Sequence, residues 1–384
     1  MMEILLWSLA AVVVYAYTGY PLLIAAAAAF SRRSVRFAPM EPTVTVVIAA
    51  FNEERDIGRK LEMVLAIDYP PAKRQVIVAS DCSTDRTHEI VQGFAAQGVE
   101  LVALPARGGK TAAQNLAMRH ARGDIVVFTD ATTELAPDSI RKLLEPFADP
   151  RVGCTGAHMD YETEGGTAIG RGGTLYWRYE RFIKQLESRV NSLIGVSGCL
   201  YAVRRALYVP MSPDLSSDFV IALDIFATDH VSVYVPDARA IEKTHERADR
   251  EFRMRVRVVV GSIHALVQRA RLLNPFRAGL FALQLWSHKV LRYLAPELLI
   301  AILLLSAWLA LQPGPRTGLY QAFVALQLAV YLLVPGLYVL CRRLDIATGP
   351  LSMPFYFVLS NAAAFWALVE YLRGDRAVTW ATVR

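Results

Sequence analysis

Residues 43–54 read Thr-Val-Thr-Val-Val-Ile-Ala-Ala-Phe-Asn-Glu-Glu, and this stretch decides the fold. Its first eight residues are β-branched or small, which is typical of a buried strand, and the polar residues that follow can begin a helix. Further strands are predicted at 75–80, 99–104 and 124–129, with helices at 53–66, 84–97 and 110–121. This alternation predicts a Rossmann-like α/β domain with a largely parallel sheet.

Polar side chains follow three of the four predicted strands. Asn52 and Glu53 follow the first, Asp81 follows the second, and Asp130 follows the fourth. Taken singly, each has a simpler explanation, because Asn and Asp cap helices and acidic residues suit a helix N-terminus. Ligands of such sheets bind beyond the carboxyl ends of the strands, so three polar ends on one edge predict a ligand site.

Apolar segments flank this domain. Residues 4–30 carry no charge, exceed the roughly 20 residues that span a bilayer, and are followed by Arg32, Arg33 and Arg36, which indicate cytoplasmic anchors rather than a cleaved signal peptide. Further apolar runs occupy 293–312, 319–340 and 352–372. We therefore expect an N-terminal transmembrane helix at 1–31, a cytoplasmic domain at 42–270, an amphipathic interface segment at 271–292, and a C-terminal transmembrane region with a short tail at 293–384.

The topology of the last apolar run stays open. Arg342 and Arg343 are expected inside, and one more crossing would place the basic tail with Arg373, Arg376 and Arg384 outside, against the positive-inside rule. The run at 352–372 therefore re-enters the membrane, lies in the membrane interface, or crosses the membrane and is followed by a tail that is an exception to the rule.

Composition agrees with a membrane protein. Of 384 residues, 54% are hydrophobic, the mean hydropathy is +0.31, and the formal net charge is +6. Because the arginines gather near the apolar runs, anionic lipids and an anionic substrate explain the charge better than nucleic acid does. The four cysteines form no CxxC pair, which favours reduced thiols over a zinc site.

Gly108-Gly109-Lys110-Thr111 resembles the end of a phosphate-binding loop, but Leu104 stands where that motif needs glycine. A lysine at a helix start opened by glycine still suits a diphosphate. The alternative is a solvated lysine at a helix end.

Four segments together, 47–54, 80–85, 109–115 and 128–132, follow the order and spacing of the family 2 glycosyltransferases. The chain resembles membrane-bound members of the cellulose, hyaluronan and poly-N-acetylglucosamine synthase group, and residues 287–292 are similar to bacterial members. The resemblance implies a GT-A domain that uses a UDP-sugar and Mg²⁺ or Mn²⁺ and inverts the anomeric centre.

The resemblance also implies roles for individual residues on the donor side. Asp81 would contact the base, and Ala49, Asn52 and Glu53 would form the neighbouring wall. Asp130 matches the first member of the metal-binding acidic pair, whereas Thr132 replaces the second. One carboxylate with the diphosphate and water still makes a workable Mg²⁺ site.

Cations are expected at the leaving diphosphate. Lys110 would aid the metal there. Arg257 lies where processive synthases carry the arginine of Gln-x-x-Arg-Trp, but Met254 and Val258 replace Gln and Trp. Arg257 can still pair with the diphosphate. The alternative is a helix face that contacts lipid headgroups.

On the acceptor side, Asp218 matches the second acid of the family's catalytic pair and is the predicted base, while Ser217 replaces the first. Asp214 and Asp224 are rivals, and the simpler explanation of Asp218 is a helix cap. Gly198 and Cys199 belong to the segment that resembles the acceptor-binding region. Trp177 would stack on a sugar or, alternatively, anchor an amphipathic helix in the membrane.

These expectations define an inverting hexosyl- or N-acetylhexosaminyltransferase in the cell (inner) membrane, multi-pass, with a cytoplasmic catalytic domain. It would transfer sugar from a UDP-sugar to a growing polysaccharide and export the polymer. The alternatives are transfer of a single sugar to a lipid-linked acceptor, or an inactive scaffold of an exopolysaccharide assembly. Expected partners are the donor, a glycan or lipid-linked acceptor, the bilayer and other assembly subunits, without nucleic acid.

Overall fold

The computed structural model describes residues 1–162, 168–243, 248–343 and 351–375, apart from the side chains of 168–174, 243, 342 and 343. The predicted tail beyond residue 375 lies outside this range. An eight-stranded sheet forms the centre of the domain, in the order β3-β2-β1-β4-β7-β6-β8-β5.

The first half of the sheet is parallel, as predicted. It contains β1 (Val44–Ala50), β2 (Arg74–Ser80), β3 (Val99–Ala103) and β4 (Ile125–Asp130). The connecting helices are α3 (Ile57–Ala66), α4 (Thr87–Gln92) and α5 (Lys110–His120). Side chains of β1 alternate between two buried clusters, with Val46 and Ile48 in one and Val47 in the other, because successive residues of a strand face opposite sides. Both faces of this half are therefore covered.

The second half of the sheet is mixed. It contains β5 (Glu134–Leu135), β6 (Val152–Glu162), β7 (Leu200–Arg204) and β8 (Val231–Lys243), with α6 (Ser139–Leu144) and α8 (Ser217–Ala227) between them in sequence. β7 runs antiparallel to both β4 and β6, and β6 runs parallel to β8. The reversal pairs Thr129 near the end of β4 with Leu200 at the start of β7. The residues that precede β7 consequently lie beside Asp130.

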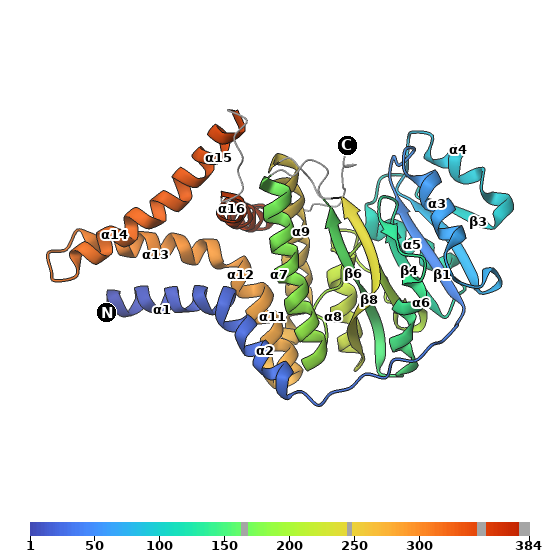
Figure 1. Cartoon of the computed structure of the whole chain (residues 1–384), viewed down its shortest axis with the longest axis horizontal. Coiled ribbons are helices and arrows are strands. Elements are labelled where there is room, and N and C mark those ends of the chain that lie inside the picture. Colours follow the sequence, from blue (N-terminus) through green and yellow to red (C-terminus); the bar gives the residue numbers. More distant parts are fainter. Residues whose placement is uncertain (163–167, 244–247, 344–350, 376–384) are drawn as a thin grey trace.

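Helices cover the side of the sheet that faces the apolar segments. They are α7 (Ala168–Val190), α9 (Ala248–Gln268), α10 (Pro275–Ala278), α11 (Leu280–Leu285), the π-helical segment Trp286–Val290 and α12 (Leu291–Tyr293). Figure 1 shows α7 and α9 between the sheet and the apolar helices, and α16 packs against both.

The apolar helices form a separate group. They are α1 (Met2–Val14), α2 (Tyr20–Phe30), α13 (Ala295–Ala310), α14 (Thr317–Leu328), α15 (Val334–Arg343) and α16 (Ser352–Arg373), with π-helical segments at Tyr15–Gly19 and Ala329–Leu333. Within the described residues, Met2–Phe30, Thr317–Cys341 and Ser352–Arg373 are long and apolar enough to span a membrane. The helical segments Leu280–Tyr293 and Ala295–Ala310 are long and apolar enough only when they are taken together, and the chain bends by 57° between them.

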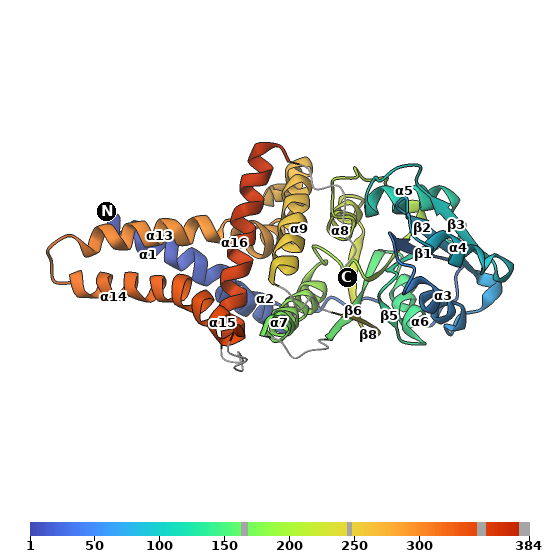
Figure 2. The same cartoon turned by 90° about the horizontal axis from the view of Figure 1, so that it is seen from above.

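The orientations of these helices differ. In Figure 1, α1, α13 and α14 project together away from the sheet, and the chain turns after α1 so that α2 runs along α7. Figure 2 shows that α16 lies crosswise to the projecting helices. Leu6, Ile302, Leu309 and Tyr320 form the packed centre of the projecting group.

Candidate functional site

Lys110 lies at the centre of the candidate site. It begins α5 directly after Gly109, whose φ of 88° is a conformation that glycine adopts without steric cost. The Nζ atom of Lys110 forms an ion pair with Oδ1 of Asp130 and donates to the carbonyl oxygen of Gly198 at 3.2 Å. A Cβ on Gly198 would lie 3.4 Å from Oδ2 of Asp218 and 3.5 Å from Nζ of Lys110. The two carboxylates, the lysine and the glycine therefore share one small volume.

Electrostatics keeps Lys110 charged. Burial alone would lower the pKa of its ammonium group, but the Asp130 carboxylate outweighs this and Asp218 adds to the effect, so that the pKa is raised. The site consequently holds a cation between two carboxylates at neutral pH.

Asp81 fixes the loop that precedes Lys110. Its carboxylate is fully buried, and its Oδ1 accepts from the amides of Gly108 at 2.7 Å and Gly109 at 2.9 Å. Its Oδ2 accepts from Nε of Arg107 at 3.0 Å, and the Arg107 guanidinium lies 3.4 Å from the centre of the Phe51 ring. A carboxylate has about four acceptor positions, so three of them are already used for positioning.

The predicted wall after β1 is joined to the loop after β2. Asn52 has a φ of 53°, and its Oδ1 accepts from the amide of Thr84 at 2.8 Å. The amide of Glu53 donates to Oγ1 of Thr87 at 2.8 Å. Because α3 begins only at Ile57 with Asp56 in the cap position, the alternative that Asn52 caps this helix is wrong. Ala49 pairs directly with Asp130 in the ladder between β1 and β4, which places the wall beside the acid.

Glu242 of β8 is a carboxylate that sequence reasoning missed. Its Oε1 accepts from the hydroxyl of Thr132 at 2.8 Å and its Oε2 accepts from that of Thr133 at 2.6 Å. Burial raises the pKa of Glu242, and the nearby charge of Asp130 raises it further. Thr132 therefore orients a carboxylate from a distant strand close to Asp130.

Lys60 of α3 was also missed. Its side chain is buried and donates to Oγ1 of Thr129 at 2.9 Å, directly before Asp130. Burial lowers the pKa of Lys60 to about 7, although Asp130 and Glu242 oppose the shift. This hydrogen bond from α3 therefore holds the end of β4 in place.

Of the three candidate bases, Asp218 is the one beside Lys110. It lies in the first turn of α8, and the preceding Ser216 makes no side-chain cap bond. Asp224 pairs with the guanidinium of Arg269 at 2.8 Å, and Asp214 accepts a hydrogen bond from Ser212. Asp224 and Asp214 are therefore each engaged by another side chain.

The remaining predicted residues line the same region. Burial lowers the pKa of Arg257, while the charges of Asp218 and Asp130 oppose the shift, so this guanidinium lies within electrostatic range of both acids. The pKa of Cys199 is raised well above its usual value, chiefly by burial, which keeps its thiol neutral.

Trp177 stacks on Tyr161 with ring centres 4.5 Å apart. Burial raises the pKa of Tyr161, and the charge of Asp218 contributes. The ring of Tyr161 therefore separates Trp177 from the region of Asp218, and the indole packs against β6 of the domain.

The donor atoms suit a hard divalent cation only with help from a substrate. Among the described residues, no group of three or more His, Cys, Asp or Glu side chains is placed to hold a metal. Asp130 and the nearby Glu242 supply carboxylate oxygens, and Mg²⁺ commonly combines one or two carboxylates with phosphate oxygens and water. The residues therefore fit a metal that binds together with a diphosphate.

A known family model covers all four of the sequence motifs described above. Residues 45–209 match the family model described as glycosyl transferase family 2. Beta-monoglucosyldiacylglycerol synthase of Synechocystis sp. is 34% identical over 116 residues, which cover 29% of this chain and 24% of that protein. Succinoglycan biosynthesis protein ExoO of Rhizobium meliloti is 34% identical over 104 residues, which cover 27% of this chain and 29% of that protein. The chain thus spans about a quarter of the length of these curated relatives.

A solved structure matches over nearly the whole chain. Mannosyltransferase PcManGT from Pyrobaculum calidifontis, in complex with GDP-Man and Mn²⁺, superimposes with a TM-score of 0.71 and 24% identity, covering 96% of this chain and 99% of that one. The similarity confirms the predicted fold class, including the arrangement of the helices that flank the sheet.

Proposed function

We propose that this chain, which carries a family 2 glycosyltransferase domain of the GT-A fold, transfers a sugar from a UDP-sugar to an acceptor at a membrane with inversion. The observation that carries the proposal is the convergence of Asp130, Gly198 and Asp218 on the Lys110 ammonium group. A cation between an acid suited to a metal and an acid free to act as base is the arrangement that such a transfer requires.

Each residue has a defined task in this proposal. Lys110 and Arg257 bind the diphosphate as the bond from the anomeric carbon to its oxygen breaks. Asp130, with Glu242 nearby, would hold Mg²⁺ or Mn²⁺, which would supply further stabilisation of the leaving charge. Asp218 accepts the proton of the acceptor hydroxyl. Gly198 has no side chain, which leaves room for the acceptor beside Asp218.

The arrangement of the helices supports three crossings. The N-terminus and the turn between α13 and α14 lie at the same end in Figure 1, where Arg316 and Glu3 pair at 2.8 Å. α16 lies crosswise to α1, α13 and α14, as expected of a helix in the interface. With α16 in the interface, Arg32, Arg342 and Arg373 all lie on the cytoplasmic side, in agreement with the positive-inside rule. We therefore place the protein in the cell membrane as a multi-pass protein with a cytoplasmic domain.

The acceptor is either a growing polysaccharide, as the family resemblance implies, or a lipid-linked molecule. The projecting helices α1, α13 and α14 pack on one another through Leu6, Ile302 and Leu309. This packing supports transfer to a lipid-linked acceptor more than passage of a polymer between these helices.

The test uses the full chain in nanodiscs with a panel of UDP-sugars and Mg²⁺ or Mn²⁺. We expect one donor to release UDP, Asp218→Asn to abolish transfer, and the matched control Asp237→Asn, an exposed acid, to behave as wild type. Product size separates a polymer from a single transfer. Absence of UDP release with every donor would favour the inactive scaffold.

A further inference from the structure

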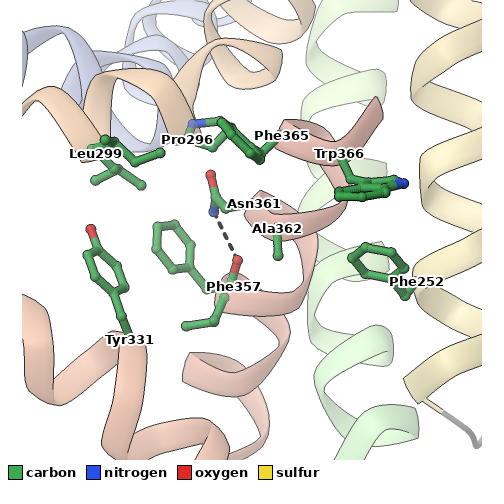
Figure 3. A pocket seen from close by; sticks show the side chains of 11 residues that line it. Phe252, Pro296, Leu299, Tyr331, Phe357, Asn361, Ala362, Phe365 and Trp366 are labelled. Carbon is green, nitrogen blue, oxygen red and sulfur yellow. Dashed lines mark hydrogen bonds between the residues drawn. The ribbon is translucent and has the colours of Figure 1, made fainter. Parts of the chain in front are cut away.

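Two cavities in the described part of the chain differ in their lining. The larger, of about 380 Å³, lies between α9, α13, the π-helical segment Ala329–Leu333 and α16, and Figure 3 shows the apolar side chains, such as Leu299 and Trp366, that surround it. The smaller, of about 270 Å³, lies between the linker after α2, the end of α7 and the first half of β8. Arg33 and Arg189 line this smaller cavity, and none of its lining residues is acidic. Arginines without an acid indicate an anionic ligand.

The smaller cavity, which we call the arginine pocket, also has apolar walls. β8 contributes Val233 and Tyr234, and the linker adds Phe37. The volume of about 270 Å³ is many times the roughly 10–15 Å³ that one water molecule needs, so a group of several heavy atoms fits. Glu242 follows Tyr234 by eight residues on β8, which is roughly 25 Å along an extended strand. The arginine pocket is therefore separate from the candidate catalytic site.

One hydroxyl group links the backbones of the two arginines. The Oγ atom of Ser31 accepts from the amide of Arg33 at 3.3 Å and donates to the carbonyl oxygen of Arg189 at 2.9 Å. The linker is thereby held against the last turn of α7. Two arginines from distant parts of the sequence are consequently brought to one cavity by contacts within the chain.

The side chain of Arg33 lacks a partner among the described residues. Its Nη1 atom is buried and makes no hydrogen bond. Burial lowers the pKa of this guanidinium, the charge of Arg151 lowers it further, and Asp149 opposes the shift. Asp149 is itself engaged by Arg151 at 2.6 Å and by the amide of Arg36. A buried donor without a partner costs free energy, and an anion in the pocket would supply the missing acceptor.

Positive charge is in excess around the arginine pocket. Within the described part of the chain, the charged groups that line it or affect the pKa of Arg33 and Tyr234 are five arginines and two acids: Arg33, Arg151, Arg181, Arg189 and Arg239, with Asp149 and Asp160. Glu187 of α7 contacts His288 instead, and the exposed Asp237 of β8 acts on Lys142. An anionic ligand would balance this excess.

An exposed apolar face of α2 leads to the pocket. The exposed residues of this helix recur at spacings of three and four residues and so share one side: Leu22, Leu23, Ala26, Ala27, Ala29 and Phe30. Phe30 is 86% exposed, and Arg33 follows it by three residues. α2 belongs to the segment Met2–Phe30, which is long and apolar enough to span a membrane, and in Figure 1 it runs along α7. A molecule with hydrocarbon chains on this face of α2 would therefore place its headgroup at Arg33.

We propose that the arginine pocket binds the phosphate of an anionic membrane lipid whose hydrocarbon chains lie along the exposed face of α2. A net negative lipid is favoured over a zwitterionic one, because an ammonium headgroup would meet no acid among the lining residues. The bound lipid holds the linker that leads to β1 against the membrane surface. This lipid is not the sugar acceptor, and the inference does not depend on the proposed function.

The test measures binding by native mass spectrometry of the full chain in detergent. The probes are phosphatidylglycerol, phosphatidylcholine with the same chains, and glycerophosphoglycerol, which is the first headgroup without chains. We expect phosphatidylglycerol to bind at least about tenfold more tightly than either of the others, a difference of about 1.4 kcal/mol. Equal affinity for phosphatidylcholine would overturn the inference. Equal affinity for glycerophosphoglycerol would assign the pocket to a soluble phosphate and would overturn the lipid as its ligand.

A matched pair of substitutions on the linker separates the pocket from a general attraction of basic residues to anionic lipid. Arg33→Gln should weaken binding of phosphatidylglycerol by about tenfold. Because Nη1 of Arg33 has no hydrogen bond to lose, the melting temperature without lipid should stay near that of wild type. Arg32→Gln removes the same charge from an exposed side chain outside the pocket and should bind as wild type.

Arg189→Gln, which changes the pocket from the side of α7, should weaken binding of phosphatidylglycerol as Arg33→Gln does. Its melting temperature without lipid shows whether the chain is folded. Wild-type affinity in Arg33→Gln and Arg189→Gln, or an equal loss in Arg32→Gln, would show that lipid is attracted by the basic linker in general and would overturn the site.

Discussion

Replacement of Lys110 by methionine tests the centre of the site most directly. The change keeps the length of the side chain but removes the cation between Asp130 and Gly198. Loss of one donor that stabilises developing charge typically costs about 2.7–4 kcal/mol, so we expect kcat/KM to fall by roughly 10²–10³. Metal affinity should respond differently. Lys110 occupies an oxygen of Asp130 in the free protein, so Lys110→Met should bind Mn²⁺ at least as tightly as wild type.

The assay combines UDP release in nanodiscs with titration of Mn²⁺ by electron paramagnetic resonance in the presence of UDP. Asp130→Asn should lose both activity and Mn²⁺ affinity, in contrast to Lys110→Met. Lys73→Met, an exposed lysine that pairs with Glu41, is the matched control. Near wild-type kcat/KM in Lys110→Met, or a loss of Mn²⁺ affinity equal to that of Asp130→Asn, would refute the assignment.

Three further predictions concern residues that support the site. Glu242→Gln should weaken Mn²⁺ affinity in the presence of UDP by about tenfold, as for groups next to a metal, and adding Thr132→Asp should restore it. Gly123→Ala should lower the melting temperature, because its Cβ would lie 2.4 Å from the backbone of β1, at a cost of about 1–3 kcal/mol, whereas Gly314→Ala should not. The pKa of Lys60 is about 7 when folded and about 10.4 when unfolded, so folding releases a proton and stability rises with pH across this interval. Lys60→Met should flatten that rise in melting temperature, and an unchanged slope would contradict the burial of a neutral amine.

The first half of the sheet could be predicted from sequence because its signals are local. A run of β-branched residues marks β1, and polar residues end it, so the predicted strand 43–50 differs from the observed Val44–Ala50 by one residue. The second half could not be predicted in this way. β7 pairs with β4 and β6 from far along the chain, and its antiparallel direction depends on tertiary contacts that no local pattern encodes.

The same distinction holds for the site. Asp81 and Asp130 were found because the ends of parallel strands meet at one edge of a sheet. Lys60 was not found, because a lysine on an amphipathic helix normally faces solvent and only the packing of α3 against β4 buries it. Asn52 was predicted to line the nucleotide site, with a helix cap as the alternative; the cap is wrong, because the side chain joins the loop after β2.

The altered motif positions weaken the inactive-scaffold alternative once their contacts are considered. Along the chain, Thr132 looks like the loss of an acid. In space, its hydroxyl donates to Glu242, so a carboxylate is present near Asp130 although it comes from β8. Ser217 is buried at the first position of α8, directly before Asp218. Because Thr132 makes a contact that positions an acid of the site, this substitution is better explained by a rearranged active centre than by decay of one.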